Sequence, residues 1–375
     1  MDEITNLLRE LVAIDSINPD LVPGGAGEGE IARFVASWLQ RMGVEVVWDE
    51  PVPGRPSVVG IVRGSGGGRS LLLNAHMDTV GVTGMQRPHE PLIEGTRLYG
   101  RGAYDMKAGL AAIMLAAAEA KKMTLRGDVI LTAVADEEYA SIGTQSIIKR
   151  WRADAAIVTE PTALQLCVAH KGFLWFEIVT RGTAAHGSRP DLGRDAIVKM
   201  GHVLLGLERL NQELQARPPH YLLGHGSLHA SLIQGGQELS SYPERCTLQV
   251  ERRTIPGETP EQVEAEVRDL LEQLHAADAT FEATVRTTLQ RAPFEVVPDA
   301  EIVQTVRRHA TLDDAPEIVG NAAWMDAALL TAAGIPTVVF GPGGAGAHAV
   351  VEWSDLQQLK KCRDVLVNTL REFCA

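Results

Sequence analysis

The sequence predicts an α/β protein whose main domain is interrupted by an inserted ferredoxin-like α+β domain. In the first part of the chain, apolar strand segments alternate with helical segments, a pattern typical of layered α/β structures. Between residues 172 and 289 the expected order becomes β-α-β-β-α-β, which is the ferredoxin-like pattern. After residue 290 the α/β pattern returns. We therefore expect a discontinuous main domain, 1–171 and 290–375, around an insertion at 172–289.

The expected elements follow from the spacing of apolar residues and from turn residues. In the main domain, helices are predicted at 30–43 and 106–122, strands at 57–62, 70–78, 128–138, 155–161 and 337–344, and a helix at the C-terminus. The Ala-rich segment 108–120 is expected to be a buried helix. In the insertion, strands are predicted at 174–182, 227–236, 246–255 and 280–289, and helices at 195–214 and 259–276.

Composition excludes several classes of protein. A formal net charge of −13 argues against a nucleic-acid-binding protein, which would normally present a basic face. The four cysteines are scattered without a CxxC pair, so we expect buried free thiols rather than a disulfide framework or a cysteine zinc site. The acidic, amphipathic start of the chain is unlike a signal peptide, and no apolar run of transmembrane length is free of charges. We expect a cytoplasmic protein with no membrane partner.

Ionisable residues stand at the ends of the predicted strands. The apolar run that begins at Leu71 ends in His76 and Asp78, and residues two apart on a strand share a face. Unpaired charges are costly inside a sheet, so these two side chains should lie where a cleft begins. Glu137, Glu138 and Glu160 also follow apolar strand runs. Ligand sites in α/β sheets lie outside the carboxyl ends of strands, so we expect these groups to share one site.

Asp105 and His348 complete the set of candidates. Each candidate has a simpler alternative: Asp105 could cap a helix, Glu137 and Glu138 could be a solvated strand end, Glu160 could start a turn before Pro161, and His348 could be a loop histidine. Taken together, two imidazoles and several carboxylates suit a metal such as zinc. One bridging carboxylate would allow two ions, while a further carboxylate stays free to accept a proton from water. The adjacent pair Glu137 and Glu138 can supply one residue of each kind.

The motifs of the chain resemble a known family, the dinuclear zinc amidohydrolases and peptidases that include acetylornithine deacetylase, succinyl-diaminopimelate desuccinylase, aminoacylase-1 and glutamate carboxypeptidase. The resemblance covers essentially the whole chain. It is carried by the segments NAHMDTV, LYGRGAYDMKAGLAA, ADEE, TEPT, GTAAHGSRPDLGRDAI, ERRTIPGET, WMDAALLTAAGIPTVVFGPG and AGAHAVVEW. It implies a mixed-sheet zinc-peptidase catalytic domain with an inserted dimerisation, or lid, domain. The subgroup that the motifs resemble most is the acetylornithine-deacetylase-like deacylases.

The resemblance also implies residue roles. One divalent ion, zinc with Co²⁺ or Mn²⁺ as alternatives, would be bound by His76 and Glu160. The second would be bound by Glu138 and His348, with Asp105 as the bridge between the two ions. Glu137 would be the general base, and Asp78 would orient His76.

Two residues of the insertion receive roles from the same resemblance. Arg253 would bind a substrate carboxylate, and His186 would reach the active site of the partner subunit in a homodimer. The expected substrate is a small N-acyl amino acid or a short peptide, hydrolysed by a metal-bridged water. Ser240, Glu251 and Met325 depart from the residues common in the family, which leaves the substrate's identity open.

Other functions fit the sequence less well. The glycine-rich segment 62–70 could suggest a nicotinamide-binding loop, but a predicted strand follows it instead of a helix, so we interpret it as a hairpin turn. No GxSxG motif supports a serine hydrolase. A metal-bearing protein without turnover would most simply lack a general base, whereas Glu137 is present. Within the family, a dipeptidase or carboxypeptidase remains the alternative to a deacylase, since both cleave an amide.

Overall fold

In the computed structural model, which describes residues 2–311 and 315–375, the chain separates into two compact units. The first comprises Met1–Val168, Val296–Val319 and Met325–Ala375. The second comprises Ala169–Glu295 and Gly320–Trp324. The predicted insertion, 172–289, lies entirely within the second unit.

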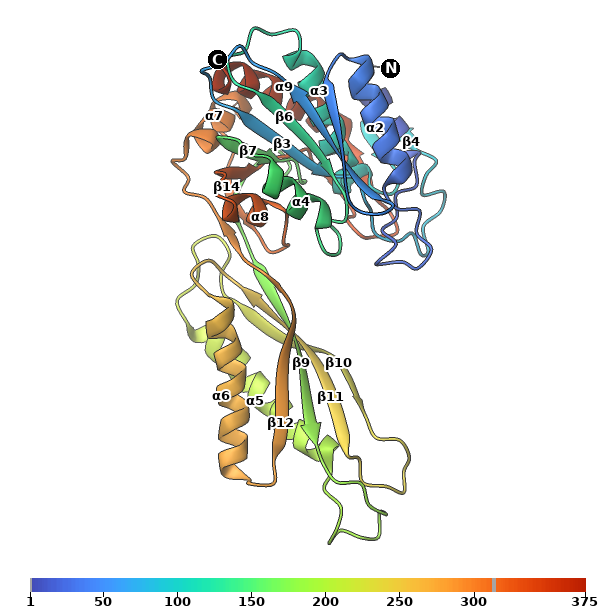
Figure 1. The fold of residues 1–375 in the computed structure, drawn as a ribbon, viewed down its shortest axis with the longest axis vertical. Coiled ribbons are helices and arrows are strands. Elements are labelled where there is room, and N and C mark those ends of the chain that lie inside the picture. Colours follow the sequence, from blue (N-terminus) through green and yellow to red (C-terminus); the bar gives the residue numbers. More distant parts are fainter. Residues whose placement is uncertain (1, 312–314) are drawn as a thin grey trace. The chain divides into compact units, whose positions relative to one another are not determined.

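The first unit is built on a mixed β-sheet (Figure 1). The strand order is β1 (Glu45–Val52), β2 (Arg55–Val62), β6 (Val129–Val134), β3 (Leu71–His76), β7 (Ala155–Val158), β15 (Thr337–Val339) and β8 (Leu166–His170), with β14 (Ile318–Asn321) beside β8. The last two residues of β8 and of β14, and the whole of β13 (Phe294–Glu295), which pairs with the end of β8, belong to the second unit. Strands β6, β3, β7 and β15 are parallel, whereas β2 pairs with β1 and β6 antiparallel. The prediction of a mixed-sheet α/β fold is confirmed.

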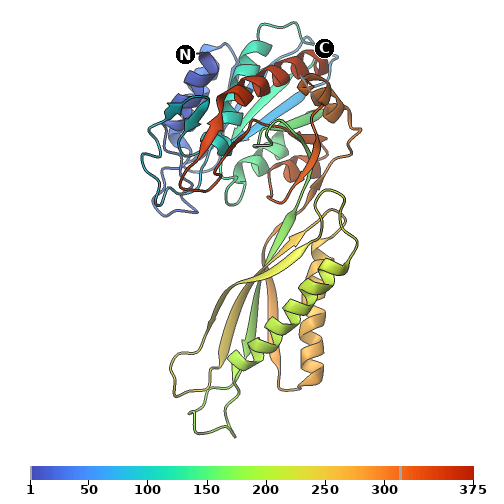
Figure 2. The same ribbon diagram turned by 180° about the vertical axis from the view of Figure 1, so that it is seen from behind.

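Helices cover both faces of this sheet. They are α1 (Glu3–Val12), α2 (Gly29–Arg41), α3 (Ala108–Ala120), α4 (Ile142–Arg150), α7 (Glu301–Ala310), α8 (Ala327–Ala332) and α9 (Leu356–Phe373). Helices α4 and α8 lie in front of the sheet in Figure 1, and α9 lies in front in the reverse view of Figure 2. Nearly every residue of α3 is buried, as its Ala-rich sequence predicted, because the helix packs between α9 and the sheet. A small sheet of β16 (Gly344–Ala345), β17 (Trp353–Asp355), β5 (Arg97–Tyr99) and β4 (Leu92–Glu94) completes the unit.

The glycine-rich segment between β2 and β3 does not form a hairpin, so that prediction was wrong. Strand β6 lies between β2 and β3 and forms hydrogen bonds with both. The segment instead crosses the start of β6, where the backbone N–H groups of Ser65 and Gly66 donate to the carbonyls of Leu125 and Arg126. A hairpin requires neighbouring strands, and here a strand from later in the chain occupies that position.

The second unit has the predicted element order. It consists of β9 (Gly172–Arg181), α5 (Ala196–Ala216), β10 (Ser227–Gly235), β11 (Arg245–Thr254), α6 (Pro260–Ala277) and β12 (Glu282–Arg291). The strands form an antiparallel sheet in the order β10-β11-β9-β12. Apolar residues of α5 and α6 pack against one face of this sheet to form a separate core.

Two expectations about the whole chain can also be checked. The four cysteines, Cys167, Cys246, Cys362 and Cys374, are free and buried, as predicted. Among the described residues, no helix has both the length and the apolar character needed to cross a membrane.

Candidate metal centre and active site

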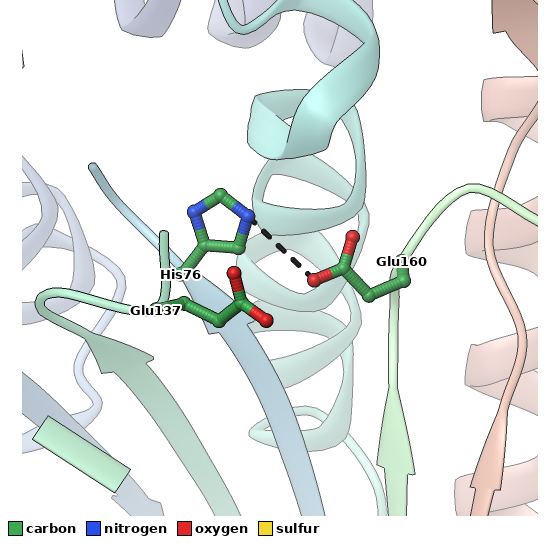
Figure 3. A group of neighbouring side chains, drawn as sticks. All are labelled: His76, Glu137 and Glu160. Atoms are coloured by element: carbon green, nitrogen blue, oxygen red, sulfur yellow. Dashed lines mark ion pairs between the residues drawn. The ribbon is translucent and has the colours of Figure 1, made fainter. Parts of the chain in front are cut away.

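Three parallel strands deliver ionisable side chains to one edge of the main sheet. Strands β6, β3 and β7 are neighbours, and their carboxyl ends lie at the same edge. His76 is the last residue of β3, Glu137 and Glu138 follow β6, and Glu160 follows β7. His76 and Glu160 are only 1% and 5% exposed. Figure 3 shows the side chains of His76, Glu137 and Glu160 converging from these three strand ends.

The ring of His76 has a defined orientation. Its Nδ1 lies 2.9 Å from the backbone carbonyl of Asp78, which can only accept a hydrogen bond, so Nδ1 carries a proton. The opposite nitrogen, Nε2, points into the group of carboxylates. It lies 3.2 Å from Oδ1 of Asp105 and 3.6 Å from Oε1 of Glu160. Burial opposes a charged ring, but hydrogen bonds to Asp105 and Asp78 raise the pKa of His76 well above its usual value, so Nε2 would have to lose a proton in order to bind a metal ion.

Asp105 connects the two histidines of the site. Whereas its Oδ1 faces His76, its Oδ2 lies 3.4 Å from Nε2 of His348. The same His348 nitrogen lies 3.1 Å from Oε2 of Glu138. Residues between positions 76 and 348 thus meet at one point, and the structure brings together all five of the predicted metal ligands.

The separations between these atoms suit metal coordination. Zinc bonds of about 2.0–2.2 Å in tetrahedral geometry place neighbouring ligand atoms roughly 3.3–3.6 Å apart. The contacts of His76, Asp105, Glu138, Glu160 and His348 fall between 3.1 and 3.6 Å. Two groups, His76–Glu137–Glu160 and His76–Asp105–Glu138, each offer ligand atoms within 4.8 Å of one another. Oε1 of Glu138 is buried without a hydrogen-bond partner among the described residues, so it has an unused lone pair for a cation.

The pKa shifts of the clustered residues also fit a site for metal cations. Burial and the carboxylate of Glu160 raise the pKa of Glu137 well above its usual value. Burial also raises the pKa of Glu160 well above its usual value, with a further contribution from Asp105. Hydrogen bonds to Asp105 and Glu138 raise the pKa of His348 to about 10. A buried excess of carboxylates needs compensating positive charge, which divalent cations supply.

Asp78 lies beneath the pair of glutamates as well as beside His76. Its Oδ1 accepts a hydrogen bond from the backbone N–H of Glu137 at 3.1 Å, and its Oδ2 accepts one from that of Glu138 at 3.2 Å. Oδ1 is also 3.5 Å from Nδ1 of His76, farther than the carbonyl of Asp78 itself. The carboxylate therefore positions the backbone of both glutamates, while the carbonyl makes the shorter contact with the imidazole.

A buried polar network behind Asp78 was not predicted from the sequence. Asn18 donates through Nδ2 to Asp78 Oδ2 at 2.8 Å and to Asp136 Oδ1 at 2.9 Å. Arg55 also donates to Asp136 Oδ1, at 2.9 Å, and its Nε donates to Glu28 at 2.7 Å. Asn18, Asp78, Asp136 and Glu28 are each fully buried. Asp136 could have been suspected because it directly precedes the glutamate pair, but Asn18 and Arg55 carry no comparable local signal.

A second unpredicted network holds the segment that carries Asp105. This segment, η1 (Ala103–Lys107), is an irregular turn before α3. The carboxylate of Glu352 accepts hydrogen bonds from the backbone N–H groups of Gly102, Tyr104 and Asp105 at 3.0, 2.9 and 3.1 Å. Arg101 donates to the same carboxylate at 2.6 Å and to the carbonyl of Ala349 at 3.0 Å. The network thereby joins the turn of Asp105 to the loop of His348.

The remaining two predicted residues belong to the second unit, outside this cluster. Arg253 lies on β11, where its Nε is 3.0 Å from the carboxylate of Glu251, one of the residues that departs from the family pattern. His186 is exposed on the loop after β9, with Nδ1 2.8 Å from the hydroxyl of Ser188. The carbonyl of Ser240, another departure, accepts a hydrogen bond from the backbone of Gly187 at 2.6 Å. Met325, the third, is buried in the first unit.

The chain is similar to known proteins along almost its whole length. An acetylornithine deacetylase from Myxococcus xanthus is 33% identical over 98% of this chain and 96% of that protein. An N-formyl-4-amino-5-aminomethyl-2-methylpyrimidine deformylase from Bacillus subtilis is 26% identical over 100% of this chain and 95% of that protein.

Solved structures show the same fold. An M20 family metallo-carboxypeptidase from Sulfolobus solfataricus superposes with a TM-score of 0.80 at 20% identity, covering 100% of this chain and 99% of that chain. A dinuclear metal-binding M20 peptidase from Bacillus subtilis gives 0.76 at 16% identity, covering 99% and 97%. The profile of peptidase family M20/M25/M40 matches residues 72–372. The family predicted from the motifs is confirmed, and the chain belongs to peptidase family M20/M25/M40.

Proposed function

We propose that this protein is a dinuclear metal hydrolase that cleaves the amide bond of an N-acyl amino acid. The observation that carries the proposal is the position of Asp105, whose two carboxylate oxygens face different histidines, His76 and His348. A carboxylate that bridges two ions needs this arrangement. A carboxylate that only capped a helix would have no reason to contact both rings.

The same contacts support an assignment of ligands. His76 and Glu160 would bind one ion, and Glu138 and His348 the other, with Asp105 shared. We propose zinc as the native metal because nitrogen and carboxylate oxygen are ligands that zinc prefers, and Co²⁺ or Mn²⁺ could replace it. Glu137 remains as the free carboxylate. A carboxylate oxygen of Glu137 also lies near the ligand atoms of His76 and Glu160. The Glu137→Gln variant therefore tests whether this residue is a general base or a metal ligand.

The residues of this site would then have separate roles in the reaction. Bound divalent ions would polarise the amide carbonyl and make a water molecule more acidic. Glu137 would take the proton of the attacking water and return it to the amine that leaves. Burial keeps the pKa of this carboxyl raised, which suits a group that must both accept and release a proton near neutral pH. Asp78 would hold the backbone of Glu137 in place during both transfers.

Substrate binding would involve Arg253. The amide being cleaved is neutral, whereas a free carboxylate on the substrate can form two parallel hydrogen bonds with a guanidinium. The likeness to an acetylornithine deacetylase supports a small N-acyl amino acid as the substrate. A dipeptidase or carboxypeptidase would use the same metals and the same base, so only the substrate distinguishes the two activities.

We also propose a homodimer formed through the second unit. Strand β10 is an edge strand of its sheet, and Leu232 and Ile233 on this strand are exposed. Ile197 and Val198 at the start of α5 are exposed as well. An unpaired edge with apolar side chains favours association with another chain. In such a dimer, His186 would donate a hydrogen bond to the oxyanion in the active site of the partner subunit.

A substrate panel tests the proposed function. Protein loaded with Zn²⁺, Co²⁺ or Mn²⁺ is assayed with N-acetyl amino acids, N-succinyl amino acids and dipeptides, and the metal content is measured in parallel. We expect two bound ions per chain and the highest kcat/KM with an N-acyl amino acid. Preference for a dipeptide would assign the peptidase activity instead. Absence of bound metal would overturn the proposal as a whole.

A further inference from the structure

The open face of the second unit's sheet carries a row of aromatic rings. Residues alternate along β9, so Leu174 and Phe176 point into the core with α5 and α6, while Phe173 and Trp175 point to the other face. The rings of Phe173 and Trp175 are 5.3 Å apart, and Trp324 meets Phe173 edge-on at 6.4 Å. Trp175 is 40% exposed, so part of this row is available to a ligand.

Arg253 lies beside this row. It is the cross-strand partner of Phe173, and its guanidinium carbon is 5.3 Å from the centre of that ring. Its Nε is paired with Glu251, whereas Nη1 and Nη2 have no hydrogen-bond partner within the part of the chain that the structure describes. The side chain is 32% exposed. A planar fork of free donors next to aromatic rings can bind a carboxylate while an attached apolar group packs on the rings.

Charged side chains lie beside the row. The guanidinium of Arg291 lies 5.5 Å from the ring centre of Trp324. Burial, together with the charges of Arg253 and Arg252, lowers the pKa of Lys171. The carboxylate of Glu251 lies 3.0 Å from Nε of Arg253 and 3.4 Å from Nε1 of Trp175. The surface defined by Phe173, Trp175, Trp324 and Arg253, here termed the arginine–aromatic surface, therefore suits an anion with an apolar group.

We propose that the arginine–aromatic surface selects an amide substrate whose free carboxylate is attached to an aromatic or other large apolar side chain. The inference rests on the proposed function in one respect, namely that the molecule bound at this surface is the substrate that the enzyme hydrolyses. It distinguishes this chain from the acetylornithine deacetylase to which it is similar, because acetylornithine carries an amine on its side chain. Carboxylate recognition at Arg253 sets the position of the substrate, and the rings Phe173, Trp175 and Trp324 set the side chain that is accepted.

The first test is a comparison of kcat/KM on the metal-loaded protein. The substrates are N-acetyl derivatives of L-phenylalanine, L-tryptophan, L-alanine and L-ornithine. We expect the two aromatic substrates to exceed the ornithine derivative by at least about tenfold, with alanine between them. A preference for N-acetylornithine over both aromatic substrates would overturn the proposal.

Variants of Trp175 test the role of the rings. Trp175→Ala should lower kcat/KM for N-acetylphenylalanine about tenfold, mainly through KM, and should lower kcat/KM for N-acetylalanine much less. Trp175→Phe keeps a ring but loses the contact between the indole N–H and Glu251, so it should restore most of the loss. Trp48→Ala is the matched control, because Trp48 is 41% exposed on β1 of the first unit. Equal losses for both substrates, or the same loss in the control, would contradict selection by the rings.

Direct binding separates this inference from the proposed function. If metal-loaded protein hydrolyses no amide in the panel, calorimetry with N-acetyl-L-phenylalanine still tests the surface. We expect binding to weaken about tenfold in Trp175→Ala and in Arg253→Ala, whereas N-acetyl-L-phenylalanine amide, which lacks the carboxylate, should bind weakly to all three proteins. No binding to the wild-type protein, or an affinity in both variants equal to that of the wild-type protein, would refute the inference.

Discussion

The carboxylate of Glu352 accepts a hydrogen bond from the backbone N–H of Asp105 at 3.1 Å, although the two residues belong to distant parts of the chain. Glu352 is only 1% exposed and receives further bonds from Gly102, Tyr104 and Arg101. In Glu352→Gln, an NH2 group replaces one of the two accepting oxygens. Its hydrogens must then point at other donors, either the backbone N–H groups or Arg101. The turn that carries Asp105 should loosen, and we expect metal affinity to fall about 10–100-fold.

The measurement for Glu352→Gln is a competition between the protein and a chelator for Zn²⁺. The absorption spectrum of the Co²⁺-loaded protein provides a second readout, because it reports the geometry of the ligands. Glu295→Gln is a suitable control, since this glutamate lies in the second unit. Unchanged affinity together with an unchanged Co²⁺ spectrum would show that Glu352 does not position Asp105.

Asn18 provides a test of the network behind the glutamate pair. Its amide nitrogen donates to both Asp78 and Asp136, and Asn18→Asp replaces this donor with a third carboxylate of the same size. We expect the unfolding free energy of the metal-free protein at pH 8 to fall by about 1–3 kcal/mol, measured by urea denaturation. Asn18→Ala removes the donor without adding a charge, so its loss should be smaller. Equal stability of all three proteins would exclude the network as a source of stability.

Glu137→Gln tests the assignment of the general base. The substitution keeps the shape of the side chain and removes its basicity. We expect metal content to remain unchanged and turnover to fall by about 10²–10⁴-fold or more. Loss of one bound ion would instead identify Glu137 as a ligand, in keeping with its closeness to His76 and Glu160. Near-normal turnover in a fully loaded variant would show that another group accepts the proton.

His186 is expected to act across the dimer. His186→Ala should reduce turnover by about 10²–10³-fold without affecting metal binding, since loss of one oxyanion donor has an effect of this size. A mixed dimer gives a sharper result. When one subunit carries Glu137→Gln and the other His186→Ala, one of the two active sites contains both native groups, so activity should partly return. If subunit exchange is verified and no activity returns, His186 does not serve the partner's site.

Asp326 gives a prediction about pH. Burial raises the pKa of this carboxyl from 3.8 to about 6, and its Oδ2 accepts a hydrogen bond from Thr144 at 2.5 Å. A carboxyl whose pKa is raised by folding destabilises the folded state when it is ionised, and this penalty fades as the pH falls from about 6 toward 4. Asp326→Asn, which stays neutral and can still accept from Thr144, should therefore be more stable than the wild type at pH 8 by about 1–3 kcal/mol.

The stability difference for Asp326→Asn should narrow between pH 6 and pH 4. Urea unfolding of both proteins in the presence of a chelator measures it without a contribution from bound metal. A difference that stays constant across this range would mean that the carboxyl has no raised pKa in the folded protein.

The sequence by itself determined the family, the mixed α/β fold and the element order of the second unit. The apolar runs ending at His76, Val134 and Val158 are local signals, and parallel strands bring their carboxyl ends to one edge. This is why the clustering of His76, Glu137 and Glu138 could be predicted. The ligand roles of Asp105 and His348 came from the resemblance to the family, since their loops carry no periodic pattern.

Only the tertiary structure decided which groups support these residues. Glu352, Asn18 and Arg55 act through hydrogen bonds to partners that are distant in the sequence, and no local pattern specifies such a partner. The glycine-rich segment before β3 was misread for the same reason, because β6 comes from later in the chain and separates β2 from β3. Local apolar patterns determine which segments become strands, whereas the order of strands and the pairing of buried polar groups depend on the packing of the complete chain.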